Sequence, residues 1–124
     1  MTTSVVALAI SVLIGVENNG SLHHNPKGVN DGGRAAGPLQ MWKISVDEAN
    51  RLVGKKQWSY CDRLDYRKSY DMAKVLLGAQ LKRKRPPTNL EELCSRWRNP
   101  NGDAPEWYKA KVRRWTQIVQ SRHL

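Results

Sequence analysis

The chain has 124 residues, which suits one domain with a single core, and its 40% hydrophobic and 26% charged residues exclude a disordered or membrane-embedded chain. Its net charge of +10 predicts attraction to anionic polymers such as nucleic acid, anionic lipid or cell wall, and charge alone does not choose among them. Cys61 and Cys94 lack the clustered partners of a zinc site, and whether they form a disulfide stays open.

The first predicted element is a helix from Thr3 to Val16 that is apolar on every face, as in a helix through the middle of a core. The apolar run is too short to span a bilayer, and no Lys or Arg precedes it as in a signal peptide, so we interpret it as a buried helix. Asn18, Asn19 and Gly20 favour left-handed conformations and predict where the helix stops.

The next segment, Ser21 to Pro38, is rich in Gly and contains few large apolar residues. This composition predicts a long irregular loop or a small β-excursion. Loops of this length inside compact domains are usually functional.

The remainder carries the start and stop signals of four more helices. A capping box at Ser45–Glu48 opens a helix that ends near Val53 and Gly54, and Thr88–Glu91 opens another that reaches Trp97. Helical spacing of apolar residues predicts a helix over 65–81. The last predicted helix begins at Asp103 or Ala104, before Pro105. Its buried face is predicted to carry Tyr108, Val112, Trp115 and Val119. We therefore predict a mainly α fold (α+β if the loop forms strands), organised as one domain over residues 1–124.

Glu17 stands at the C-terminal end of the first predicted helix, where the helix dipole disfavours a carboxylate. Partial burial against the apolar helix disfavours the charge further. Both effects predict a raised pKa, which a general acid working near neutral pH needs. The alternative is a solvated glutamate at a helix end.

Asp31 is the only other acidic residue between Glu17 and Asp47, and it lies among glycines where it is expected to be solvated and ionised. One carboxyl group in an apolar setting and one in a polar loop is the division of roles that a two-acid glycosidase uses. The alternative for Asp31 is an Asx-turn residue.

The segments Glu17–Gly20 and Asp31–Met41 resemble the core signature of the lysozyme superfamily. In goose-type lysozymes and soluble lytic transglycosylases a helix ends in Glu and a Gly-Leu-Met-Gln segment follows, and invertebrate-type lysozymes have Gly-Pro-Phe-Gln-Ile, to which Gly37–Met41 is similar. Asp31 precedes Gly37 by the offset of the water-positioning aspartate in goose-type enzymes. The later aromatic-Asn-Gly-Gly-Pro motif of the superfamily is degraded here, because the segment around Asn99 lacks the paired glycines.

The resemblance implies a peptidoglycan glycosidase that cuts between N-acetylmuramic acid and N-acetylglucosamine, with Glu17 as the acid. Asp31 would position a water for hydrolysis; without it, the muramic 6-hydroxyl would attack, as in a lytic transglycosylase. The implied substrate-binding residues are Gln40, Trp42, Asn99 and Tyr108. A core role is the alternative for Trp42 and Tyr108, and a turn role for Asn99.

Two alternative functions remain open at this point: a non-catalytic wall-binding module with the lysozyme fold, and a basic nucleic-acid-binding protein. We expect no metal, because His23 and His24 are adjacent and lack a third ligand at a usual spacing, and no cofactor. The basic run Lys82–Arg85 is interpreted as a solvated helix end rather than a nucleic-acid site. The expected partners are peptidoglycan strands and the anionic cell envelope, with a monomer acting at the wall, either phage-encoded or secreted.

Overall fold

The computed structural model describes residues 3–23 and 34–122, and these residues are mainly helical. The elements are α1 (Thr3–Asn18), α2 (Lys43–Val53), the short 3-10 helix η3 (Tyr60–Leu64), α3 (Tyr66–Leu81), α4 (Leu90–Arg98) and α5 (Glu106–Ser121). The described residues contain no strand, and their single isolated β-bridge pairs Ala36 with Met41 in antiparallel fashion. The mainly α prediction is confirmed, and the β-excursion within the described part of the chain is reduced to this bridge.

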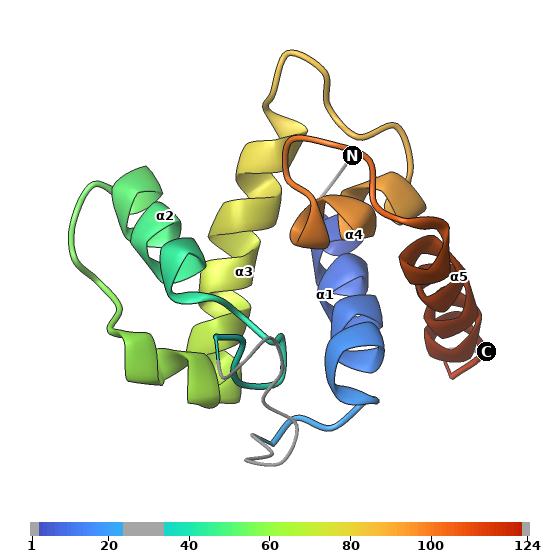
Figure 1. Ribbon diagram of the computed structural model, residues 1–124, viewed down its shortest axis with the longest axis horizontal. Helices are drawn as coiled ribbons and strands as arrows, with labels where there is room; N and C mark the ends of the chain where they lie inside the picture. Colours follow the sequence, from blue (N-terminus) through green and yellow to red (C-terminus); the bar gives the residue numbers. More distant parts are fainter. Residues whose placement is uncertain (1–2, 24–33, 123–124) are drawn as a thin grey trace.

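Helix α1 lies in the middle of the molecule, as its apolar sequence predicts. Figure 1 shows α2, α3, α1 and α5 in this order from left to right, and α1 contacts α3, α4 and α5. Seven hydrophobic side chains of α1 are buried: Val6, Ala9, Ile10, Val12, Leu13, Ile14 and Val16. A helix that is apolar all round needs neighbours on several sides, and α1 has them.

The contact between α1 and α5 depends on a glycine. A Cβ atom at Gly15 would lie 2.3 Å from the Trp115 ring, so only glycine lets this ring pack directly against the α1 backbone. The predicted stripe of α5 forms the other side of the contact, with Tyr108, Val112 and Val119 buried. This close approach brings the first turn of α5 to the C-terminal end of α1.

We predict that Gly15→Ala destabilises the protein by about 1–2 kcal/mol, because overpacking against Trp115 outweighs the better helix propensity of alanine. Gly78→Ala is the matched control, since a Cβ at this glycine of α3 meets no atom within 4 Å. We expect the control to stabilise the protein by up to about 1 kcal/mol. Urea unfolding of both variants measures the two effects, and an equal change in the same direction would contradict the packing argument.

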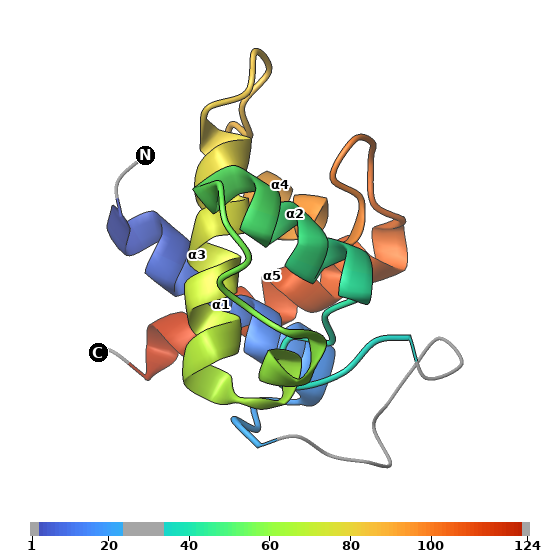
Figure 2. The ribbon, with the colours of Figure 1, turned by 90° about the vertical axis from the view of Figure 1, so that its left-hand side faces the viewer.

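Helix α2 packs beside α3, as Figure 2 shows from the side, and it covers a second hydrophobic cluster there. The buried members of this cluster are Met41, Val46, Ala49, Trp58 and Met72. Asn50 fixes the chain that follows α2, because its Nδ2 donates to the Trp58 carbonyl (2.9 Å) and its Oδ1 accepts from the Trp58 N–H (2.9 Å). The cluster thereby anchors α2 next to the Ala36–Met41 bridge.

Several predicted boundaries are corrected by the structure. Helix α2 begins at Lys43 with Trp42 as its N-cap, so the Ser45–Glu48 capping box is wrong; the chain passes directly from the β-bridge at Met41 into the helix. The N-cap of α4 is Asn89, whose side chain accepts from the Glu92 N–H, and not Thr88. These shifts occur because several adjacent residues can cap a helix, and packing selects among them.

Two further points concern the start of α5 and the cysteines. Pro105 is the N-cap of α5 rather than its first residue, since Asp103 forms an ion pair with Lys109 (2.7 Å) instead of capping the helix.

Cys61 and Cys94 are free thiols, and burial raises the pKa of Cys94 to about 12. In the described residues no helix is long and apolar enough to cross a membrane.

Candidate active site

Glu17 lies in the last turn of α1 and is half-buried. The two residues after Asn18 end the helix as predicted, since Asn19 (φ 53°) and Gly20 (φ 87°) are both left-handed and the Gly20 N–H donates to the Ile14 carbonyl (3.1 Å). This sharp end turns the chain away from the helix axis directly after the carboxylate.

Tyr108 holds the Glu17 carboxylate in place. Its hydroxyl donates a hydrogen bond of 2.6 Å to Glu17 Oε1, and only 2% of Tyr108 is exposed. Burial raises the pKa of Tyr108 far above its ordinary value, and the charge of Glu17 and the hydrogen bond raise it further. The hydroxyl is therefore a permanent donor at any physiological pH, which orients the carboxyl group.

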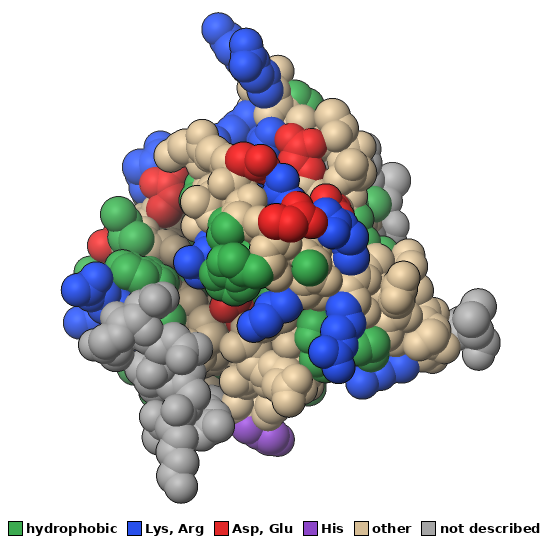
Figure 3. Space-filling model, turned by 45° about the vertical axis from the view of Figure 1, so that its right-hand side comes forward, with side chains coloured by type: hydrophobic (Ala, Val, Ile, Leu, Met, Phe, Trp, Pro, Cys, Tyr) green, Lys and Arg blue, Asp and Glu red, His purple; other side chains and the backbone are tan. Residues whose placement is uncertain are grey.

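A cleft of about 770 Å³ opens beside this pair and collects residues from four parts of the chain. Of the residues predicted for the site, it is lined by Glu17, Gln40, Trp42, Asn99 and Tyr108. Asp31 and His24 lie outside the described residues. On the face shown in Figure 3 a central hydrophobic patch has Lys and Arg side chains on either side and an acidic side chain recessed below it.

Gln40 reaches the cleft in a tight turn that the Ala36–Met41 bridge closes. The Gln40 N–H and its Nε2 both donate to the Gly37 carbonyl, each at 3.0 Å, and the Gln40 backbone is left-handed (φ 48°). The Trp97 indole N–H donates to the Leu39 carbonyl at 3.0 Å, which links the turn to α4. The polar groups of this buried turn are satisfied by the protein itself, which makes it a rigid wall of the cleft.

Arg63 holds the same turn in place through hydrogen bonds, and no pattern in the sequence predicts this role. Its Nη1 donates to the carbonyls of Arg34 and Met41, both at 3.0 Å, and its Nε donates to the Tyr60 carbonyl at 2.8 Å. A Cβ atom at Gly37 would lie 1.7 Å from the Arg63 carbonyl oxygen. The unpredicted helix η3 thus fixes the position of the turn that carries Gln40.

Trp42 lies at the rim of the cleft rather than in the core. Its side chain is 38% exposed, and the Arg34 guanidinium lies 5.6 Å from its ring centroid. The core alternative therefore does not apply to Trp42. Tyr108 has the core role, because its ring is buried, and its hydroxyl reaches Glu17.

Asn99 is the C-cap of α4, and its side chain has one unsatisfied polar atom. Its N–H donates to the Ser95 carbonyl (3.1 Å), whereas its buried Oδ1 has no hydrogen-bond donor among the described residues. A buried acceptor without a donor is unfavourable, so a small shift of this side chain toward the cleft would let its oxygen gain a donor.

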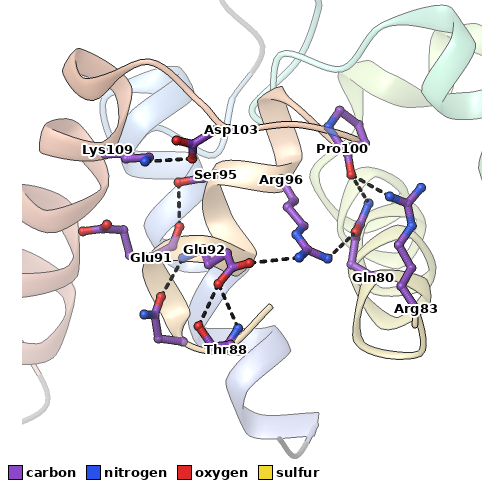
Figure 4. A network of polar contacts seen from close by, with 11 residues as sticks. Gln80, Arg83, Thr88, Glu91, Glu92, Ser95, Arg96, Pro100, Asp103 and Lys109 are labelled. Carbon is purple, nitrogen blue, oxygen red and sulfur yellow. Dashed lines mark hydrogen bonds and ion pairs between the residues drawn. The ribbon is translucent and has the colours of Figure 1, made fainter. Parts of the chain in front are cut away.

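The turn after Asn99 is held by a polar network between α3, α4 and α5 (Figure 4). Arg83 Nη1 donates to the Pro100 carbonyl at 2.7 Å, and Arg96 connects Gln80 (3.3 Å) with Glu92 (2.9 Å). Arg83, from the basic run Lys82–Arg85, thus has a structural role here. No group of His, Cys, Asp and Glu within the described ranges could hold a metal ion.

We predict that Tyr108→Phe lowers the activity of this site by about 10- to 100-fold, because a misplaced reacting group loses the benefit of orientation. The phenyl ring keeps the packing, so the fold should survive. Tyr70→Phe, at a half-buried tyrosine of α3, is the control and should retain activity. Equal activity of the Tyr108→Phe variant would show that the hydrogen bond does not orient the carboxylate.

The same variant has a readout that does not depend on activity. Because folding raises the pKa of Tyr108, its contribution to stability is complete below the ordinary tyrosine pKa of 10.0 and decreases as the pH rises above it. Wild type should therefore lose stability above about pH 10 more steeply than Tyr108→Phe. Urea unfolding at several pH values from about 8 to about 11, on both sides of that pKa, measures the difference.

Several cleft residues escaped the sequence reasoning: Ile44, Ser45, Trp97, Arg98, Trp107 and Lys111. No local pattern in the sequence separates these residues from ordinary helix residues. Comparisons of the chain with protein-family models, curated protein sequences and solved structures gave no match.

Proposed function

We propose that the protein is a peptidoglycan glycosidase with a lysozyme-like domain, which cleaves the bond between N-acetylmuramic acid and N-acetylglucosamine. The observation that carries this proposal is the hydrogen bond of 2.6 Å from Tyr108 to Glu17, at the end of a buried helix and inside a cleft of about 770 Å³. A carboxyl group held in a partly apolar cleft is suited to protonate a leaving oxygen.

In this proposal Glu17 is the general acid. Because Oε1 accepts from Tyr108, the transferable proton is assigned to Oε2, and it passes to the glycosidic oxygen as positive charge develops on the sugar ring. Gln40, Trp42 and Asn99 line the same cleft and would contact the sugars. After a small shift of its side chain toward the cleft, the Asn99 Oδ1 would accept from an acetamido N–H or a hydroxyl.

The second step distinguishes two enzyme classes. If Asp31 activates a water, the reaction is hydrolysis and the anomeric configuration is inverted. If Asp31 takes no part, the muramic 6-hydroxyl attacks and an anhydro product forms. The presence of an acid at position 31 favours hydrolysis.

The test is the release of soluble muropeptides from purified peptidoglycan by the wild-type protein, followed by mass spectrometry. Hydrolysis gives products with a free reducing end, and transglycosylation gives products lighter by one water. Absence of both products at high enzyme concentration would overturn the proposal.

A non-catalytic glycan-binding module is the second candidate, because two tryptophans at the cleft are well exposed, Trp42 (38%) and Trp107 (54%). Exposed aromatic rings beside a cleft are suited to contact sugars without any chemistry. This function predicts that the protein sediments with insoluble peptidoglycan and releases no product, so the same experiment separates the two candidates.

A further inference from the structure

Trp107 lies at the start of α5 beside the cleft, and two cations are held over its ring. The Arg98 guanidinium carbon is 4.9 Å and the Lys111 Nζ 5.6 Å from the ring centroid. All three residues line the cleft, and we refer to them as the Trp107 cluster. The proposed function does not use any of them.

The charges of the Trp107 cluster are not neutralised by carboxylates. Among the described residues, the side chains of Arg98 and Lys111 make ring contacts but no ion pair or hydrogen bond. Neighbouring cations behave differently, since Arg96 pairs with Glu92 (2.9 Å) and Lys109 with Asp103 (2.7 Å). A ring contact restrains a cation but does not use its N–H donors, so both groups keep donors for an anion.

The cleft itself is positive at this end. Among the described residues that line it, Glu17 is the sole acid, against the two cations of the Trp107 cluster. The cluster is also close to the candidate acid, because the rings of Trp107 and Tyr108 are in edge contact (5.9 Å) and Tyr108 donates to Glu17. A ligand positioned at Glu17 therefore has its neighbouring groups near Arg98 and Lys111.

We infer that the Trp107 cluster is a subsite for a carboxylate carried by the glycan, so that the cleft selects anionic peptidoglycan over neutral N-acetylglucosamine polymers. This inference rests on the proposed function for the identity of the polymer. In peptidoglycan a carboxylate is carried by the stem peptide or, where the peptide is removed, by the lactyl group of the muramic acid. Arg98 offers a planar guanidinium to such a group and Lys111 an ammonium.

The test is calorimetric titration of soluble glycans into the protein carrying Glu17→Gln, so that no ligand is consumed. The ligands are native muropeptides, the same muropeptides with amidated carboxyl groups, peptide-free glycan chains and chitooligosaccharides. The double variant Arg98→Gln/Lys111→Gln is compared with Lys55→Gln/Lys56→Gln, which removes two exposed charges that do not line the cleft.

We expect native muropeptides to bind about 5- to 10-fold more tightly than amidated ones, which is the range for two partly exposed charge contacts. Arg98→Gln/Lys111→Gln should remove this difference, whereas Lys55→Gln/Lys56→Gln should retain it. If peptide-free chains also depend on Arg98 and Lys111, the subsite accepts the lactyl carboxylate as well; if they do not, it accepts only the carboxylates of the stem peptide.

Equal binding of native and amidated muropeptides, or no binding of any ligand, would overturn the inference. Charge-dependent binding combined with no product from wild-type protein would instead contradict the proposed catalysis and leave the carboxylate subsite standing. The two failures are therefore distinguishable in one set of samples.

Discussion

Glu17→Gln is expected to reduce the release of muropeptides by about 10²- to 10⁴-fold, the range that a positioned general acid contributes. The amide has nearly the shape of the carboxyl group, and its oxygen can still accept the hydrogen bond that Tyr108 now donates to Oε1. The cleft should therefore keep its geometry while losing the proton that the leaving oxygen requires.

The matched control for this variant is Glu48→Gln in α2, which removes the same charge at an ion pair with Arg51 outside the cleft. We expect it to retain activity within about twofold, because exposed ion pairs contribute little to stability. Turbidity loss of bacterial cell walls and product mass spectra measure both variants. Full activity of Glu17→Gln would exclude Glu17 as the acid.

Gly37→Ala is expected to have the largest effect on the fold near the cleft. Gly37 has φ +83°, and a Cβ there would lie 1.7 Å from the Arg63 carbonyl oxygen and 2.7 Å from its carbon. Both atoms belong to backbone, so no side-chain rotation relieves the clash. Left-handed strain and overpacking together predict a loss of about 3–5 kcal/mol in the free energy of unfolding, or displacement of the turn.

Gly54→Ala separates the two causes, because Gly54 has nearly the same φ (+80°) and a Cβ there meets nothing within 4 Å. We expect this control to cost about 1 kcal/mol, the strain alone. Urea unfolding gives both values, and activity should be lost with Gly37→Ala because the turn carries Gln40 into the cleft. Similar costs for the two variants would refute the contact with Arg63.

The local signals in the sequence were sufficient for the helices. The apolar run before Glu17 and the Asn18–Gly20 stop depend only on nearby residues, and the structure confirms both. The capping boxes located α2 and α4 but misplaced their first residues. Helix α2 starts directly after the β-bridge without a side-chain cap, and in α4 the adjacent Asn89 caps in place of Thr88. Helix η3 was missed because it has no periodic apolar pattern.

The features of the candidate site divide in the same way, into those that nearby residues determine and those that depend on packing. The sequence by itself determined that Glu17 ends a buried helix, since helix ends are set by neighbouring residues. Only the tertiary structure decided that Tyr108, 91 positions away, donates to Glu17, and that Arg63 holds the turn beside the cleft. Such contacts depend on how α1, α5 and η3 pack, and that packing is set by fits such as Gly15 against Trp115, which no local pattern contains.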